Sequence, residues 1–411
     1  MIFRTIPDGW GIKKMPQVVK WGSGGTPKAT EKQYYDGGSI PWLVIGDLND
    51  SIVSFSASKI TELGLQNSSA KMIPAGTLLV AMYGSIGKLG ITGIECCTNQ
   101  AIAYAKELYG VTTKYMFFYM AMMKSELISK GKGGTQKNIS QTVLNSLEVI
   151  VPPLPEQERI VSRIEELFSQ LDAGVETLKK TKAQLAVYRQ AVLKEAFEGR
   201  LTASGPEKIV RLGDYIETPR YGTSKKCSYD DGRDRTAVYR IPNIEHKNGR
   251  ISHDDIKYAQ FTESELDGIR LQQGDILIIR SNGSVSLVGR AAMVCDADIT
   301  GTFAGYLMRL RISEPETLLP KFLLLFLQSH QARIYIENKA KSTSGVHNIN
   351  STEISDLQMP LYDPDTQYAI IEAIESRLSV CDSIEQTVDT ALQQAEAMRQ
   401  SILKNAFEGR L

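Results

Sequence analysis

The sequence predicts an α+β protein in which two globular domains are joined by two long helices, which form an antiparallel coiled coil in a pseudo-two-fold arrangement. A long internal repeat is the first reason. Residues 188–201 recur as 398–411, and both copies end in Ala-Phe-Glu-Gly-Arg-Leu. Phe197 recurs as Phe407, 210 residues later, whereas repeat arrays have periods of roughly 20–50 residues. The chain is therefore expected to contain one unit twice, each copy a globular part followed by a helix.

Heptad spacing of apolar residues is the second reason. One series is Ile164, Leu171, Leu178, Leu185 and Val192, and the other is Ile374, Cys381, Val388, Ala395 and Ile402. Sustained heptads are typical of coiled coils, and the offset of 210 residues keeps the two series in phase. Each helix of about 45 residues would be roughly 68 Å long at ~1.5 Å per residue. Two separate amphipathic helices, each docked on its own domain, are the alternative.

Turn residues divide the chain into four parts. Prolines at 152, 153 and 155 favour a helix start, whereas Gly199 and the Gly205-Pro206 pair favour its end. We therefore expect globular domains at 1–151 and 205–360, followed by helical arms at 152–204 and 361–411. Within the domains, the residue pattern predicts strands at 40–45, 77–82, 276–280 and 307–312, and helices at 114–129 and 319–339.

The two predicted domains also match each other loosely. The segment that begins at Gly76 parallels the one that begins at Gly274, and Val44-Ile45-Gly46-Asp47 parallels Arg240-Ile241-Pro242-Asn243. Tyr83-Gly84-Ser85 likewise parallels Asn282-Gly283-Ser284. The domains are thus expected to share one fold and to differ in their surfaces.

Charge is balanced overall, with 47 Lys and Arg against 47 Asp and Glu. The first 150 residues are basic, with 15 against 10, and the last 51 are acidic, with 4 against 9. This distribution is compatible with DNA binding in one region and protein contacts in another. The five cysteines lack metal-binding spacing, which favours a reduced, cytoplasmic protein. No apolar run approaches the ~20 residues of a membrane helix.

The sequence contains no persuasive active site. Gly84-Ser85-Ile86-Gly87-Lys88 has two residues between its glycines, where a phosphate-binding loop needs four. The four histidines are scattered and form no metal or triad pattern. Asp234 with Glu245-His246-Lys247 is only a faint likeness to a nuclease site. We therefore expect no metal, no cofactor and no catalytic residue.

Several short motifs occur together and in order along the whole chain. They are Gly24-Gly25-Thr26-Pro27, Pro152-Pro153-Leu154-Pro155-Glu156-Gln157, the segments 271–277 and 280–284, and the paired Ala-Phe-Glu-Gly-Arg-Leu endings. In these features the chain resembles the specificity (S) subunit of type I restriction–modification enzymes. The segment 359–364, before the second arm, lacks the Pro-Glu-Gln form found before the first, which leaves the docking contacts of that arm open.

The resemblance implies two target-recognition domains, each reading one half of an asymmetric bipartite site in double-stranded DNA. Helical arms would set the spacer between the half-sites and dock two methyltransferase (M) subunits, and ATP-driven restriction (R) subunits would join the assembly. The subunit itself would not be catalytic. A stand-alone, two-headed DNA-binding regulator and a coiled-coil protein adaptor are the rival functions, and a nuclease is disfavoured because an acidic cluster is missing.

Candidate DNA-binding residues are Lys, Arg and polar side chains in Gly-rich segments, because cations contact phosphates and polar groups read base edges. In the first domain they are Lys28, Lys32, Tyr83, Ser85, Lys88, Lys130, Lys132, Gln136, Lys137 and Asn138. In the second they are Arg220, Lys225, Lys226, Arg280, Asn282, Ser284, Lys341, His347 and Asn348. The loops at 130–138 and 280–284 are the preferred sites, since their glycines allow close backbone approach.

Overall fold

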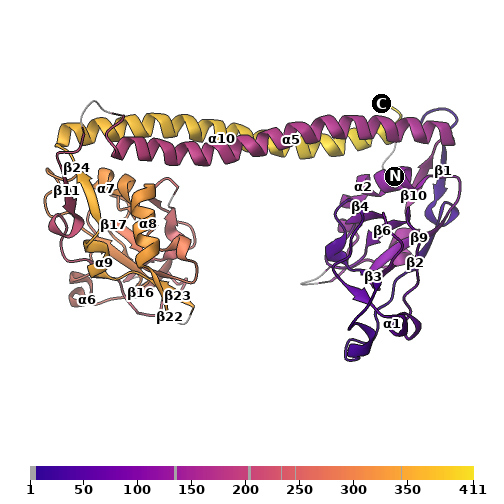
Figure 1. Cartoon of the computed structure of the whole chain (residues 1–411), viewed down its shortest axis with the longest axis horizontal. Coiled ribbons are helices and arrows are strands. Elements are labelled where there is room, and N and C mark those ends of the chain that lie inside the picture. Colours follow the sequence, from indigo (N-terminus) through magenta and orange to yellow (C-terminus); the bar gives the residue numbers. More distant parts are fainter. Residues whose placement is uncertain (1–5, 134–136, 202–204, 233, 246, 344) are drawn as a thin grey trace. The chain divides into compact units, whose positions relative to one another are not determined.

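The computed structural model describes residues 6–133, 137–201, 205–232, 234–245, 247–343 and 345–411. The chain forms two compact units: unit 1 comprises Met1–Leu178 with Asp389–Leu411, and unit 2 comprises Lys179–Val388. Both units mix helices with sheets (Figure 1). The α+β prediction is therefore confirmed.

Unit 1 is built on a five-stranded sheet of order β2-β9-β6-β7-β4, beside a three-stranded sheet β5-β3-β8 and the pair β1-β10. Its strands are β1 (Gly11–Lys14), β2 (Val19–Ser23), β3 (Ile40–Leu43), β4 (Ser51–Val53), β5 (Lys59–Ile60), β6 (Leu78–Ala81), β7 (Leu89–Thr92), β8 (Cys97–Thr98), β9 (Ile102–Leu108) and β10 (Glu148–Val151). Its short helices are α1 (Glu62–Gln66), α2 (Thr113–Met122), α3 (Lys124–Ser129) and α4 (Gln141–Asn145).

Unit 2 repeats this plan with a four-stranded sheet β12-β21-β17-β19, a three-stranded sheet β16-β13-β20 and the pair β11-β24, to which it adds β14-β15 and β18-β23-β22. Its strands are β11 (Lys208–Arg211), β12 (Arg220–Tyr221), β13 (Arg235–Tyr239), β14 (Ile244–Glu245), β15 (Arg250–Ile251), β16 (Lys257–Gln260), β17 (Ile276–Ile279), β18 (Ser281–Asn282), β19 (Ala291–Met293), β20 (Thr302–Phe303), β21 (Leu307–Leu310), β22 (Lys341–Thr343), β23 (Val346–Asn348) and β24 (Gln358–Leu361). Its short helices are α6 (Glu263–Asp267), α7 (Pro320–Leu327), α8 (His330–Lys339) and α9 (Ser351–Ser355).

The loose sequence match between the domains corresponds to a shared fold. Gly76 and Gly274 precede the central strands β6 and β17, and both have a positive φ, +84° and +86°. Asp47 and Asn243 close the same short turn, because each side chain accepts the backbone N–H three residues earlier, at 2.8 and 2.9 Å. The four predicted strands are present as β3, β6, β17 and β21, shortened by one or two residues.

The two predicted apolar helices are each divided in two. The segment 114–129 forms α2 and α3, and 319–339 forms α7 and α8. In the second segment the break has a local cause, since the Ser329 hydroxyl accepts the N–H of Ala332 and starts α8 as an N-cap. The apolar pattern continues across both breaks, so periodicity alone does not show them.

The two predicted arms form the long helices α5 (Leu154–Phe197) and α10 (Pro364–Phe407), of 44 residues each. Within unit 1, Asp172 of α5 pairs with Arg399 of α10, and the Arg159 guanidinium donates to the carbonyl of Leu411 at 3.0 Å. Later residues of α5 therefore face earlier residues of α10, so the two helices are antiparallel there. No helix in the described ranges has the length and apolar character that a membrane span requires.

The same antiparallel pairing occurs within unit 2. Arg189 of α5 lies 2.6 Å from Asp382 of α10, and Glu195 lies 3.7 Å from Arg377. The antiparallel pair of long helices that the heptads predict is thus present in each unit.

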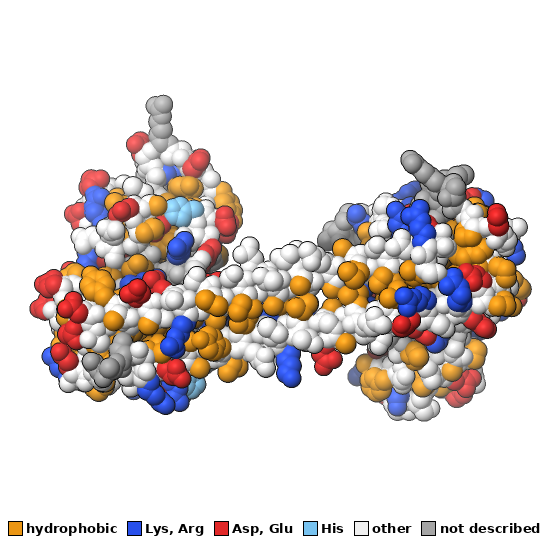
Figure 2. Space-filling view, turned by 90° about the horizontal axis from the view of Figure 1, so that it is seen from above, with side chains coloured by type: hydrophobic (Ala, Val, Ile, Leu, Met, Phe, Trp, Pro, Cys, Tyr) orange, Lys and Arg blue, Asp and Glu red, His pale blue; other side chains and the backbone are white. Residues whose placement is uncertain are grey.

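One line of the predicted heptad seam is better covered than the other. Of its ten residues, Leu171, Leu178, Leu185 and Ile402 are half-buried, and the other six are buried: Ile164, Val192, Ile374, Cys381, Val388 and Ala395. Side chains three residues after this line are more open: Tyr188 is 47% exposed, Ile384 40% and Met398 54%. When only two helices pack together, each buries one line of the other's apolar side chains. The apolar side chains beside that line then stay at the surface. Figure 2 shows hydrophobic side chains exposed along the long helices.

The repeated phenylalanines hold the helix ends on the globular parts. In unit 2, the Phe197 ring packs edge-on against Phe322 and Phe326 of α7, with centroids 5.3 and 5.2 Å apart. In unit 1, Phe407 packs in the same way against Tyr115 and Tyr119 of α2, at 5.2 and 5.1 Å. All these rings are at least nine-tenths buried. The repeated ending is thus explained by two equivalent aromatic clusters.

The glycine of the repeated ending stops each helix. Gly199 and Gly409 have φ values of +74° and +70°, which favour glycine. The N–H of Arg200 donates to the Glu195 carbonyl, and that of Arg410 donates to the Asn405 carbonyl, both at 2.9 Å. This is the hydrogen-bond pattern of a Schellman motif, which satisfies the last carbonyls of a helix.

The repeated glutamines join the start of each long helix to its unit. Gln157 is fully buried, accepts the N–H of Thr112 at 3.0 Å and donates to the carbonyls of Gly110 and Pro152 at 2.9 Å. Gln367, also fully buried, makes the equivalent bonds to Leu319, Thr317 and Tyr362. Buried amides of this kind are costly to replace, because several backbone groups would lose their partners.

The aromatic clusters predict separable effects of two matched substitutions. Phe407→Ala should destabilise unit 1, and Phe197→Ala should destabilise unit 2, each by about 3–5 kcal/mol, as is typical for removal of a buried ring. Hydrogen exchange followed by mass spectrometry should show faster exchange in α2 for the first variant and in α7 for the second. Val187→Ala, at a side chain that is 71% exposed in α5, is the control. If either variant speeds hydrogen exchange equally in α2 and α7, the two aromatic clusters are not independent.

Candidate DNA interface

In unit 1 the fold brings the two candidate loops together. The first follows β6 and contains Tyr83 and Ser85, and the second follows α3 and contains Lys137 and Asn138. The N–H of Gly84 donates to the Lys137 carbonyl at 3.1 Å, and Tyr83 forms a β-bridge with Asn138. Asn138 is also held by Lys132, with which it exchanges two backbone hydrogen bonds of 2.9 Å. The loops thus form one surface, although the paired residues Tyr83 and Asn138 are 55 positions apart in the sequence.

Unit 2 contains the same loop pairing with different side chains. Ser281 is paired with Asn348 and Asn282 with His347, and Asn348 is also paired with Lys341. The N–H of Ile349 donates to the Arg280 carbonyl at 2.9 Å, as that of Ile139 donates to Met82 in unit 1 at 2.8 Å. Tyr83 is therefore the counterpart of Ser281, so the sequence match drawn through the glycines is wrong by one residue.

The remaining candidates of unit 1 differ in how free their side chains are. Lys28, Lys32, Lys132 and Lys137 are exposed, and Lys28 lies 3.4 Å from Glu31. Lys88 is half-buried, and its ammonium donates to the Ile45 carbonyl at 3.4 Å, so part of its bonding capacity is used within the fold. Gln136 lies outside the described residues.

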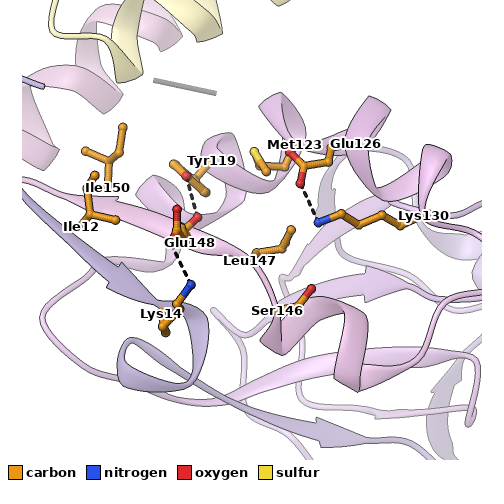
Figure 3. Close-up of a pocket in the computed structure, with 10 residues that line it drawn as sticks. All are labelled: Ile12, Lys14, Tyr119, Met123, Glu126, Lys130, Ser146, Leu147, Glu148 and Ile150. Carbon is orange, nitrogen blue, oxygen red and sulfur yellow. Dashed lines mark hydrogen bonds and ion pairs between the residues drawn. The ribbon is translucent and has the colours of Figure 1, made fainter. Parts of the chain in front are cut away.

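Lys130 lines a small pocket of about 190 Å³ in unit 1 (Figure 3). The cations of this pocket are paired, Lys130 with Glu126 and Lys14 with Glu148, both at 2.7 Å. The Lys14 ammonium holds the pKa of the Glu148 carboxyl below its usual value. Burial raises the pKa of Tyr119, whose hydroxyl donates to the Glu148 carbonyl at 2.9 Å. Lys130 is therefore held by a neighbouring carboxylate, whereas Lys132 and Lys137 have no such partner among the residues that the structure describes.

A larger hollow, of about 670 Å³, lies in unit 2 beside the loop pair. We call it the unit 2 hollow; it is lined by Tyr221, Gly222, Thr223, Ser224, Lys225, Cys227, Arg240, Ile241, Pro242, Lys257, Arg280, Ser281, Ala304, Gly305 and Tyr306. Of these, only Lys225 and Arg280 are among the candidates from the sequence. Arg240 was not among the candidates. The sequence comparison of the two domains pairs Arg240 with Val44, and this match could have drawn attention to Arg240.

Cations of the unit 2 hollow are partly neutralised by nearby acids. Lys225 lies 2.7 Å from Glu265, and Arg240 lies 2.9 Å from Asp255. The hydrogen bond from Lys225, together with those from Thr262, lowers the pKa of Glu265 from 4.5 to about 2. The Lys225 ammonium also lies 4.9 Å from the centre of the Phe261 ring. This lysine is thus held by the fold.

The other candidates of unit 2 lie at the surface or in the loop pair. Arg220 and Lys226 are exposed. Asn282 accepts the N–H of Ser284 at 2.8 Å, which shapes the turn after β18. His347 is half-buried, with a ring nitrogen 3.1 Å from the Ala340 carbonyl. For Lys341 the structure describes the backbone, which lies in β22.

Glycines fix the backbone at the start of both candidate surfaces. A Cβ at Gly24 would lie 2.2 Å from the Thr98 carbonyl oxygen, and one at Gly222 would lie 2.2 Å from that of Phe303. Neither position can hold a side chain without moving the backbone. Lys28 follows Gly24 by four residues and Lys226 follows Gly222 by four, and both lysines are exposed.

The Lys225–Glu265 pair predicts a coupled titration. Since the pKa of Glu265 is lowered in the folded state, its contribution to stability is present above pH 4.5 and is lost as the pH falls toward 2. Lys225→Met should raise this pKa toward 4.5, which an NMR titration of the side-chain carboxyl carbon can measure. Lys226→Met, at the exposed neighbour, should leave it unchanged. A Glu265 pKa that does not move in the first variant would contradict the pairing.

No group of three or more His, Cys, Asp or Glu residues within the described ranges is placed to hold a metal ion. The surfaces offer backbone amides, hydroxyls, carboxamides and cations, which are the groups that contact phosphates and base edges in DNA.

The chain is similar to proteins of known function. Residues 7–186 match the type I restriction modification DNA specificity domain. The EcoKI specificity subunit of Escherichia coli strain K12 is 25% identical over 423 residues, which cover 99% of this chain and 90% of that protein. The StySPI specificity subunit of Salmonella potsdam is 24% identical over 422 residues, with the same coverage of both chains.

A solved structure has the same fold. It comes from work on complex assembly and conformational transition of the type I R-M system, and it matches 99% of this chain and 100% of its own with a TM-score of 0.77 at 16% identity. Over nearly its whole length the chain is similar in sequence to type I restriction enzyme specificity subunits, and residues 7–186 match the DNA specificity domain of these proteins.

Proposed function

We propose that this chain is the DNA-recognition subunit of a type I restriction–modification complex, and that each unit reads one half of an asymmetric bipartite site. The observation that carries the proposal is the repeated loop pair. Both units hold the same two loops together through Asn138 or Asn348, yet the side chains on the loops differ. One scaffold with two different surfaces suits a site whose halves differ in sequence.

At each surface, cations would contact phosphates and polar groups would contact base edges. Exposed lysines, such as Lys28 and Lys137 in unit 1 and Lys226 in unit 2, suit phosphates, because such contacts give affinity without sequence information. Tyr83, Ser85, Asn282 and Ser284 lie on the paired loops and can meet base edges. Lys88, Lys130 and Lys225 already have partners within the protein, so we assign them secondary roles.

The long helices would dock the methyltransferase subunits. Exposed apolar side chains are the supporting observation: Val187 and Tyr188 on α5, and Val380 and Ile384 on α10, are 40–71% exposed within unit 2. Met398 adds a further one in unit 1, at 54%. Apolar groups gathered on a surface commonly mark a protein interface. Two methyltransferase subunits and the restriction subunits would complete the assembly on DNA in the cytoplasm, and chemistry would lie with those partners.

Exchanging residues 1–150 for the corresponding segment of another specificity subunit tests the division of labour. Co-expression with the neighbouring methyltransferase gene, followed by sequencing of host DNA for methylated adenines, should show two short half-sites around a fixed gap. The exchange should change one half-site and leave the other as it was. An exchange that alters both halves would contradict independent reading by the two units.

The same experiment separates the rival functions. A stable complex that leaves no methylation motif would favour the protein adaptor. Tight binding of one site without any partner would favour the stand-alone regulator. Salt-sensitive DNA binding would count against the adaptor, because phosphate contacts release counterions.

The helices are also proposed to set the gap between the half-sites. Their heptads are in phase, so inserting one heptad at equivalent positions in α5 and α10 should preserve the buried line while it lengthens both helices by about 10 Å. The methylation motif should then keep its two half-sites and gain about three unspecified base pairs at ~3.4 Å each. Inserting four residues in each helix, which breaks the heptad phase, is the control and should impair assembly. An unchanged gap in the heptad variant would exclude the helices as the ruler.

A further inference from the structure

Arg280 occupies a constrained position at the edge of the unit 2 hollow. It follows β17, and its guanidinium carbon lies 4.4 Å from the centre of the Tyr221 ring. One terminal nitrogen, Nη1, donates to the Gly305 carbonyl at 3.0 Å. The Tyr221 hydroxyl in turn accepts the N–H of Ser351 at 3.1 Å. The ring and the carbonyl thus hold the guanidinium in place, and its remaining terminal N–H groups have no hydrogen-bond partner within the described part of the chain.

The charge of Arg280 is not neutralised by a carboxylate within the described part of the chain. This distinguishes it from Lys225 and Arg240 in the same hollow, which pair with Glu265 and Asp255. Its Nε atom is covered and has no hydrogen-bond partner among the described residues, as is also true of Arg240 and Arg309, so a ligand would be contacted by the terminal nitrogens. Fixing an arginine side chain costs conformational entropy, and a contact with a ligand would offset that cost.

The positions of unit 1 that correspond to this pair hold other side chains. In unit 2, Tyr221 and Ile278 both lie opposite Met308, and Arg280 is two residues beyond Ile278. In unit 1, Ser23 and Val80 both lie opposite Ala103. The residues that correspond to Tyr221 and Arg280 are therefore Ser23 and Met82. Met82 is 4% exposed, so at this place unit 1 presents no cation.

We propose that Arg280, positioned by Tyr221, reads a guanine in the half-site that unit 2 recognises; this inference rests on the proposed function. Guanine presents two adjacent acceptors, N7 and O6, in the major groove. A guanidinium held from one side can donate to both at once, because its N–H groups are arranged as a planar fork. Arg280 would therefore select a base, and unit 1 would have no equivalent preference at the corresponding position of its half-site.

Substitutions at Arg280 and Tyr221 can distinguish base reading from phosphate binding. The chain would be co-purified with its methyltransferase subunits, and its binding measured on duplexes in which each position of the site is varied in turn. Arg280→Ala should remove a preference of roughly 10–100-fold for guanine at one position. Arg280→Lys should lose most of it too, since an ammonium lacks the fork. Tyr221→Leu should weaken the same preference, whereas Tyr221→Phe, which keeps the ring, should retain most of it.

Controls keep this outcome separate from misfolding and from failure of the proposed function. Arg270→Ala, at a half-exposed arginine of the same unit, should leave the guanine preference intact, and the half-site read by unit 1 should persist in every variant. If Arg280→Ala weakens all duplexes equally and Arg280→Lys restores binding, Arg280 contacts a phosphate and the inference is overturned. If the unsubstituted complex has no bipartite preference, the proposed function itself fails.

Discussion

Burial of one aromatic ring at the end of each long helix is the contact on which the rest of the structure depends. Phe197 and Phe407 enter equivalent clusters on α7 and α2, and the Schellman motif after each phenylalanine ends the helix there. Gln157 and Gln367 fix the opposite ends of the same helices by bonds to backbone groups. Each globular part is therefore held by the start of one helix and the end of the other. The loops are then free to vary, because stability is supplied elsewhere.

The division between scaffold and surface is visible along the central strands. The residues of β6 and β17 are buried and apolar, and both strands follow a glycine of positive φ. The residues just beyond the strands diverge: Met82 and Tyr83 in unit 1, Arg280 and Ser281 in unit 2. Backbone hydrogen bonds hold both loop pairs in the same way, so they constrain position without constraining side-chain identity. A surface of this kind can change its specificity with little effect on the core.

Sequence patterns predicted the parts of this structure that depend on local spacing. Heptads and the repeated ending located α5 and α10, and the Gly-rich segments located the two loops that the fold joins. Breaks after Met122 and at Ser329 were not predicted, because the apolar pattern continues across them. The exposed side of the seam at Tyr188 and Met398 was also missed, since heptad spacing does not show how many helices meet.

Electrostatic partners were the least predictable feature. Glu265 holds Lys225 from 40 residues away, and Asp255 holds Arg240 from 15 residues away. Nothing local in the sequence marks either pair, because both depend on how β13, β16 and the turns around them are packed. A lysine or arginine in a Gly-rich segment can therefore be a free contact or part of the fold. The unit 2 hollow shows both cases side by side.

The two units differ in how many separate stretches of the chain they contain, and this difference has a consequence for biosynthesis. Unit 2 is drawn from one continuous stretch, Lys179–Val388, whereas unit 1 needs the distant segment Asp389–Leu411. During synthesis the stretch that forms unit 2 is made without interruption, but the aromatic cluster on α2 must wait for Phe407, which is made about 290 residues after Tyr115 and Tyr119. Apolar side chains such as Tyr115 and Tyr119 would stay uncovered during that interval, which is when a nascent chain is most prone to aggregate or to need a chaperone.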